Sequence, residues 1–209
     1  MTPHALHLSI LYGNRESGHS YKVKLALHLL GIEHEYREVD LDVPLAERPA
    51  EFRAASRFGE VPVFVDGDSA LAQSNAILLH LAERTGGLGG ALPTERLTEW
   101  LFWEANRIGF SVPNLRMART YGAETASLDV VAWLESRAVK DLDRLDHELS
   151  AQPFLIGSSV SIADIACCAY LYWPEQAGLD LTRWPRVVDW LERISALPGW
   201  ADPYELLRA

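Results

Sequence analysis

The chain has 209 residues, of which 48% are hydrophobic and 23% charged, and its formal net charge is −10. This balance is typical of a globular protein with enough apolar material to form a core, and it excludes a disordered chain. An acidic surface repels phosphate backbones, so we expect no nucleic-acid partner. A small anionic ligand in a locally positive pocket is still allowed.

The two cysteines, Cys167 and Cys168, are adjacent. Neighbouring cysteines form only a strained disulfide, and they lack the spacing of metal ligands. We therefore expect two small core residues and no metal site. The first residues lack the pattern of a signal peptide, and no apolar run is long enough to cross a membrane. These features predict a cytoplasmic protein with no membrane partner.

The first third of the chain alternates between strand and helix patterns. A short apolar run over 6–12 predicts a strand, and Gly31 suits the C′ position of the helix that follows. Residues 32–41 predict a second strand, which would complete a βαβ unit by parallel pairing. The helix is marked by apolar residues at i, i+3, i+4 and i+7, namely Val23, Ala26, Leu27 and Leu30.

A less regular stretch over 44–57 is followed by the clearest local signal. Residues 61–72 hold two apolar runs around Asp66-Gly67-Asp68, a pattern that predicts a β-hairpin. Ser74 then begins a helix that ends at Gly86. The first part therefore has the predicted order β-α-β-(α)-β-β-α.

Residues 85–94 contain four glycines and a proline, which indicates a linker. Beyond it we predict helices over 95–110 and 128–149, one that starts between Ser161 and Asp164, and one with Pro185 at its first position. The fold class is therefore α+β, with domains over 1–84 and 95–209. We interpret Ser161 and Asp164 as a capping box without chemistry.

Polar residues gather where the first strand meets the first helix, as Ser17, Gly18, His19 and Ser20. Ordinary N-capping requires one of them. A helix N-terminus that binds an anion can use several. The residues alone leave both interpretations open.

Four stretches make the chain resemble the glutathione S-transferase superfamily, and specifically its bacterial theta- or zeta-like members. The stretches are 11–32, 58–82, 92–104 and 154–165, and they occur in the family's order. The resemblance implies a thioredoxin-like N-terminal domain (βαβαββα) and an all-helical C-terminal domain. It also implies glutathione as co-substrate, a homodimer, and a detoxifying transferase that acts on a small electrophilic, largely apolar substrate.

By this resemblance, Ser17 donates its hydroxyl to the glutathione sulfur. A free thiol is mostly protonated near neutral pH, and a donor together with a helix N-terminus favours its thiolate. Ser20 is then expected to be the N-cap. Tyr12 is the rival donor or a pocket residue, although we prefer it in the core. His19 is expected at the pocket mouth, where it would add positive character.

The resemblance also assigns the rest of the glutathione site. It implies a cis bond before Pro62, which lets the backbone of Val61 pair with the cysteinyl part of glutathione. Gln73 and Ser74 would hold the γ-glutamyl carboxylate at a helix N-terminus. An ordinary proline at a strand start is the alternative for Pro62. Capping is the alternative for Ser74, and there the two roles are compatible.

The glycine carboxylate needs a positive group, which we assign to Arg57, with Arg53 and Arg48 as alternatives. Glu60 should point away from that carboxylate, since like charges repel. An electrophile pocket is expected against the helical domain, lined by Tyr12, Asn106, Phe110 and Asn114.

Other functions of the same fold stay open. Peroxide reduction or reductive dehalogenation would use the same thiolate, and some proteins with this fold are non-catalytic interaction modules. Disulfide exchange would favour a cysteine near 17–20. Zeta-like members carry Ser-Ser-Cys where this chain has Ser17-Gly18-His19, which disfavours maleylacetoacetate isomerase chemistry.

Overall fold

The computed structural model describes residues 8–208. A four-stranded sheet has the order β2-β1-β3-β4, where β1 is Ser9–Gly13, β2 is His34–Glu38, β3 is Val63–Asp66 and β4 is Ser69–Ala72. β1 pairs with β2 in parallel, and the remaining pairs are antiparallel. The predicted βαβ unit and hairpin are therefore confirmed. Residues 6 and 7 of the predicted first strand lie outside the described residues.

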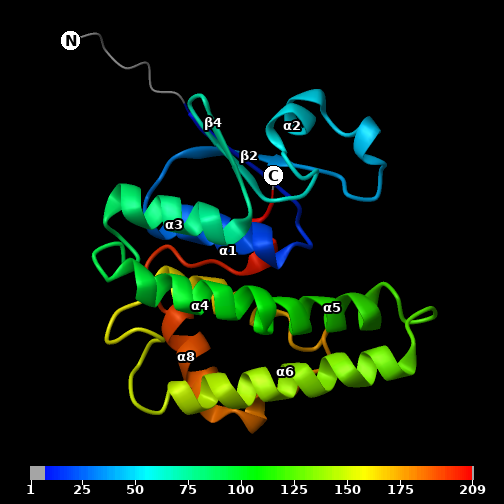
Figure 1. Ribbon diagram of the computed structural model, residues 1–209, viewed down its shortest axis with the longest axis vertical. Coiled ribbons are helices and arrows are strands. Elements are labelled where there is room, and N and C mark those ends of the chain that lie inside the picture. Colours follow the sequence, from blue (N-terminus) through cyan, green and yellow to red (C-terminus); the bar gives the residue numbers. More distant parts are fainter. Residues whose placement is uncertain (1–7, 209) are drawn as a thin grey trace.

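The sheet separates two apolar layers. α1 (Gly18–Leu29) and α3 (Ser74–Thr85) lie against one face, and α2 (Ala50–Ala55) lies on the other (Figure 1). Successive side chains of a strand point to opposite faces. Leu11 therefore joins the main core, whereas Tyr12 joins a small cluster with Phe52 on the α2 side.

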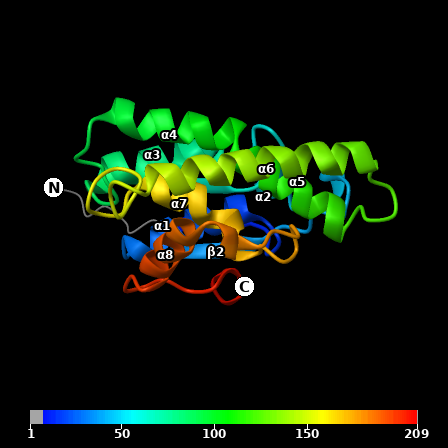
Figure 2. The same cartoon turned by 90° about the horizontal axis from the view of Figure 1, so that it is seen from below.

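The helical part contains α4 (Thr94–Asn106), α5 (Ile108–Thr120), α6 (Leu128–Glu148), α7 (Ile162–Cys168), α8 (Pro185–Ser195) and α9 (Pro203–Leu206). Short 3₁₀ turns cover Leu45–Glu47, Ala169–Tyr172 and Leu181–Arg183. Figure 2 shows α4 and α6 on one side, α8 on the other, and α7 between them. Every residue of α7 is buried, so this helix forms the centre of the part.

Two helices replace the single one that we predicted over 95–110. Arg107 leaves helical geometry, with φ −120° and ψ −107°, and α5 begins one residue later. α5 continues through Pro113. The sequence pattern did not predict it, because a proline inside a helix removes a backbone hydrogen bond.

The segment between α3 and α4 includes a close backbone approach. A Cβ atom at Gly90 would collide with the backbone carbonyl of Ala82, so only glycine fits there. One buried hydrophobic cluster then spans both parts, with Leu25 and Ile77 from the first and Leu101 and Ile165 from the second. The segments on either side of residue 85 therefore share one core. The division into domains over 1–84 and 95–209 remains our proposal.

A buried ion pair joins the two parts. Lys22 Nζ of α1 lies 2.7 Å from Glu104 Oε1 of α4, with side-chain exposures of 0% and 1%. Asn75 of α3 donates to Glu104 Oε2 over 2.7 Å and accepts from Lys22 over 3.2 Å. The charges are paired and hydrogen-bonded, as burial requires.

The capping box at α7 is confirmed. Asp164 Oδ2 accepts from the Ser161 amide at 2.9 Å, and Asp164 Oδ1 accepts from Trp190 Nε1 at 2.9 Å. Cys167 and Cys168 are free and buried, as expected of core residues. Within residues 8–208, no helix combines the length and apolarity needed to cross a membrane.

Candidate functional site

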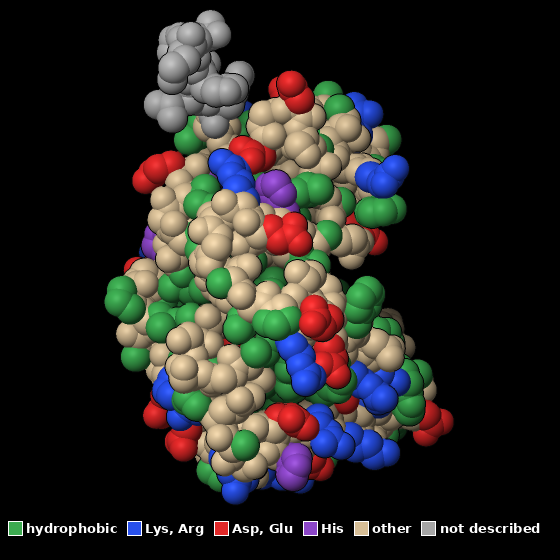
Figure 3. Space-filling model, turned by 60° about the vertical axis from the view of Figure 1, so that its left-hand side comes forward, with side chains coloured by type: hydrophobic (Ala, Val, Ile, Leu, Met, Phe, Trp, Pro, Cys, Tyr) green, Lys and Arg blue, Asp and Glu red, His purple; other side chains and the backbone are tan. Residues whose placement is uncertain are grey.

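A cavity of about 520 Å³ opens where α1 and α3 begin. It brings together most of the predicted glutathione residues. Leu41, Arg48, Gly59 and Glu60 complete its lining, which includes Ser17, His19, Val61, Pro62, Gln73 and Ser74. Figure 3 shows a notch at one edge of the molecule, between its upper and lower halves.

Ser17 is the N-cap of α1. Its backbone is extended, with φ −95° and ψ 110°, and its Oγ accepts from the Ser20 amide at 3.1 Å. Our assignment of the cap to Ser20 was wrong, because the helix begins at Gly18 and Ser20 lies in its first turn. Ser20 is fully buried, and its Oγ accepts from the Asn14 amide at 3.1 Å. An accepting hydroxyl keeps its own hydrogen, so Ser17 can still donate.

The turn before Ser17 is held by Asn14. The Asn14 carbonyl accepts from the Ser17 amide at 3.0 Å, and Asn14 Oδ1 accepts from the Glu16 amide at 2.9 Å. Asn14 Nδ2 donates to the Val39 carbonyl at 3.0 Å. The side chain thus satisfies local backbone groups and fixes the position of Ser17.

His19 is a neutral group in this structure. Burial, together with the nearby charge of Lys22, lowers its pKa to about 3. Its ring packs edge-on against Tyr170, with 5.1 Å between ring centroids. The expectation that His19 adds positive character was therefore wrong, since a desolvated imidazole beside an ammonium does not bind a proton.

The Val61–Pro62 peptide bond is cis, as expected. Pro62 is buried, and Val61 is partly exposed on the cavity wall. The structure therefore places the cis bond and Val61 at the cavity wall, and the pairing of the Val61 backbone with glutathione stays a prediction.

Gln73 and Ser74 form the start of α3. Gln73 has φ +70° and ψ 112°, which is rare for a residue with a side chain. Such outliers often occur at functional sites. No side chain among the described residues caps α3, and Ser74 occupies its first position. The capping alternative for Ser74 was therefore wrong, and the first amides of α3 can bind an anion.

Glu60 lies on the cavity wall and accepts from Gln73 Nε2 at 3.1 Å, so the expectation that it turns away was wrong. Arg48 also lines the cavity, but its guanidinium donates to the backbone carbonyls of Val43, Gly59 and Leu41 at 3.2, 3.0 and 3.1 Å. Arg57 is exposed and is not part of the lining. Arg48 is therefore the cavity's arginine.

The structure does not bring the residues of the expected electrophile pocket to this cavity. Tyr12 is buried, with its hydroxyl 3.1 Å from Arg37 Nη1 and its ring 5.7 Å from that of Phe52. Phe110 packs against Trp133, with 6.1 Å between ring centroids. Asn114 donates to the Phe110 carbonyl, and the Asn106 carbonyl accepts from Arg137, both over 2.7 Å.

A second cavity, of about 360 Å³, borders the first between α3 and α4. It shares His19, Gln73 and Ser74 with the first cavity. Its remaining lining is mostly apolar and includes Leu79, Leu101, Phe102 and Ala105. We expected an electrophile pocket against the helical domain, but none of the four residues that we assigned to it lines this cavity.

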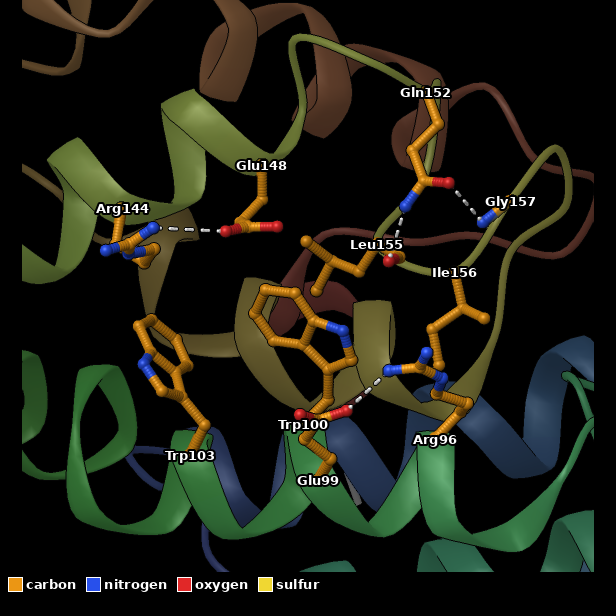
Figure 4. Close-up of a pocket in the computed structure, with 10 residues that line it drawn as sticks. All are labelled: Arg96, Glu99, Trp100, Trp103, Arg144, Glu148, Gln152, Leu155, Ile156 and Gly157. Carbon is orange, nitrogen blue, oxygen red and sulfur yellow. Dashed lines mark hydrogen bonds and ion pairs between the residues drawn. The ribbon is translucent and has the colours of Figure 1, made fainter.

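A separate cavity of about 520 Å³ lies between α4 and the end of α6 (Figure 4). Trp100 and Trp103 form its aromatic wall, with 5.4 Å between ring centroids. Its charged groups pair with one another, since Arg96 lies 3.1 Å from Glu99 and Arg144 lies 3.2 Å from Glu148. The four charged side chains of this cavity therefore each have a partner within it. Across residues 8–208, no group of three His, Cys, Asp or Glu residues could hold a metal ion.

Comparison with family models gives two matches. The model described as "Glutathione S-transferase, N-terminal domain" matches residues 11–89, and "Glutathione S-transferase, C-terminal domain" matches residues 129–198. Together they cover more than half of the chain and most of the cavity lining.

Two curated relatives match over nearly the whole chain. The "Disulfide-bond oxidoreductase YfcG" of Escherichia coli (strain K12) is 32% identical over 207 residues, which cover 92% of each protein. The "Probable maleylacetoacetate isomerase" of Vibrio cholerae is 29% identical, covering 92% of this chain and 94% of that protein.

Solved structures share the fold. A glutathione S-transferase of Pseudomonas fluorescens has a TM-score of 0.84 and 33% identity, covering 94% of this chain and 98% of that one. A glutathione transferase homologue of Lodderomyces elongisporus, solved with two GSH per subunit, has a TM-score of 0.82 and 21% identity. It covers 96% of this chain and 99% of that one.

Proposed function

Because the chain belongs to the glutathione S-transferase family, we propose that it binds glutathione in the cavity at the N-termini of α1 and α3 and activates its thiol. The thiolate then attacks a small electrophilic, largely apolar substrate. The observation that supports this most is the position of Ser17, an N-cap hydroxyl that lines the cavity with a hydrogen left to donate.

The cavity would hold glutathione at several points. The first amides of α3 receive the γ-glutamyl carboxylate, where the helix dipole favours negative charge. The backbone of Val61 pairs with the cysteinyl part. Arg48 rather than Arg57 supplies positive charge for the glycine carboxylate, because Arg48 lines the cavity.

The chemical step follows from these positions. The thiol proton leaves to solvent, and the Ser17 hydroxyl donates a hydrogen bond to the sulfur anion. The sulfur lone pair forms a bond to the electrophilic carbon, and the leaving group departs with the electron pair of the broken bond. His19 is neutral, so it adds no charge to the site.

Steady-state kinetics with glutathione and 1-chloro-2,4-dinitrobenzene test this proposal. Wild type should form the thioether, and S17A should lose most of kcat while binding glutathione in calorimetry. Binding without turnover of this or other electrophiles would favour a non-catalytic module. Absence of glutathione binding would contradict the proposal.

Reduction of disulfides is a second candidate, favoured by the similarity to a disulfide-bond oxidoreductase. Cys167 and Cys168 are buried, and burial raises their thiol pKa values, so neither is a suitable nucleophile. Two glutathione thiols would therefore supply the electrons, giving oxidised glutathione and two product thiols from one substrate disulfide. Turnover of hydroxyethyl disulfide without thioether formation would select this candidate.

We also propose a cytoplasmic homodimer. Phe58 and Phe102 are 55% and 77% exposed. Phe102 borders the apolar cavity between α3 and α4, and the tryptophan cavity of Figure 4 lies on α4 as well. A two-fold dimer that packs through α4 would cover Phe102 on both copies at once.

A further inference from the structure

The turn that carries Ser17 is bound to the helical part through its neighbour Glu16. Arg116 of α5 donates from Nη1 to the Glu16 carbonyl at 2.6 Å and from Nη2 to Glu16 Oε2 at 2.7 Å. The Arg116 side chain is only 2% exposed. This carbonyl belongs to the peptide group that joins Glu16 to Ser17. Arg116 therefore fixes the orientation of the peptide plane that precedes Ser17.

Arg116 is itself fixed on its other sides. Its Nε donates to Gln176 Oε1 at 2.7 Å, and its guanidinium lies 4.6 Å from the ring centroid of Trp173. An arginine with these partners occupies a single orientation, because its planar fork cannot rotate without losing several bonds.

The Glu16 carboxylate collects further donors. Its Oε2 accepts from the hydroxyls of Tyr121 at 2.8 Å and Tyr204 at 3.0 Å. The side chain of Arg15 lies 3.8 Å from Oε1. Burial raises the pKa of this carboxyl, but the bonds from Tyr121, Tyr204 and Arg116 outweigh burial, and the net pKa is lowered. Glu16 is therefore an anion one residue from Ser17.

A second contact from the helical part restrains the residue after Ser17. A Cβ atom at Gly18 would lie 2.7 Å from the ring of Tyr170, so the tyrosine packs directly on the glycine backbone. Residues on both sides of Ser17 are therefore held by side chains more than 90 positions away in the sequence.

From this arrangement we propose that Arg116 is a positioning residue for thiol activation. It orients the Glu16–Ser17 peptide and balances the Glu16 charge, so that the Ser17 hydroxyl stabilises a glutathione thiolate. The inference rests on the proposed function. It assigns Arg116 no contact with glutathione, so glutathione affinity should depend little on it.

Charge variants separate this role from a merely structural one. R116Q removes the buried cation 2.7 Å from Glu16 and should raise the pH midpoint at which bound glutathione ionises. E16Q leaves Arg116 as an uncompensated cation and should lower that midpoint. Each shift should reach at least about 0.3 pH units, a twofold change in the ratio of thiolate to thiol. Loosening of the turn alone would raise the midpoint in both variants.

The experiment measures the ultraviolet thiolate signal of saturating glutathione against pH for wild type, R116Q, E16Q and the double variant. R119Q is the matched control, since Arg119 is on the same helix and binds the Ala177 carbonyl and Glu135 instead. R119Q should keep the wild-type midpoint, and the double variant should return toward it. Calorimetry should give glutathione dissociation constants within about threefold of wild type.

If R116Q does not fold, the E16Q arm decides the matter by itself. Suppose that the ionisation midpoint of glutathione bound to wild type lies below that of free glutathione. A raised or unchanged midpoint in E16Q would then overturn the inference, while the proposed function stands. Absence of glutathione binding by wild type would overturn both. Opposite shifts in the two single variants would support the inference.

Discussion

Three substitutions at Ser17 separate its two roles. The structure gives it a capping role, accepting from the Ser20 amide at 3.1 Å, and we propose a second role as hydrogen-bond donor to sulfur. S17T keeps both functions. S17D keeps an acceptor for the amide but replaces the donor with a negative charge. S17A removes both.

The magnitudes follow from each role. Loss of an N-cap costs about 1 kcal/mol, which for a chain of this size lowers Tm by about 2–4 °C. A hydrogen bond to a charged group contributes about 1.5–3 kcal/mol, equivalent to about 1–2 pH units in the ionisation of bound glutathione. Thermal stability should therefore fall only in S17A. The thiol midpoint should rise in S17A and rise further in S17D.

Differential scanning calorimetry measures the Tm of each variant, and the ultraviolet thiolate titration measures the ionisation midpoint of bound glutathione independently. S17D that ionises glutathione as well as wild type would refute the donor role, because aspartate has no hydrogen to give at neutral pH. S17A that melts like wild type would refute the capping role.

Three further predictions concern the ion pairs and the surface. E104Q should lose about 3–5 kcal/mol in urea unfolding because it leaves a buried lysine unpaired, whereas E99Q, in an exposed pair on the same helix, should lose less than about 1 kcal/mol. F102E should yield monomers in sedimentation analysis, and L128E, a change at another exposed apolar residue, should keep the wild-type mass. The pKa of Glu16 is lowered from its ordinary 4.5, so the stability that it contributes is present above pH 4.5 and is lost as the pH falls through its folded value. The difference in unfolding free energy between wild type and E16Q should therefore shrink below pH 4.5, and a difference that grows on acidification would contradict the pairing.

Local patterns predicted much of the fold. The hairpin around Gly67, the helix that begins at Ser74 and the capping box at Ser161 each depend on neighbours within a few residues, and the structure confirms all three. The cis bond before Pro62 came from family resemblance rather than from local physics.

Contacts between distant segments could not be predicted in the same way. The assignment of the cap to Ser20 was wrong because the first residue of a helix depends on where the preceding turn ends. Hydrogen bonds of Asn14 stabilise that turn. Arg116 had no signal in the sequence, since its partner Glu16 is 100 positions away. Phe110 is apolar in a helix near the site, but the course of α5 turns it toward Trp133.

The ionisation of glutathione bound to wild-type protein is the decisive measurement for thiol activation. Free thiols have a pKa of about 8.5. With saturating protein, we expect the ultraviolet thiolate midpoint of bound glutathione to lie at least about one pH unit below the value for free glutathione. A midpoint at or above the value for free glutathione would contradict activation by Ser17 and the N-terminus of α1.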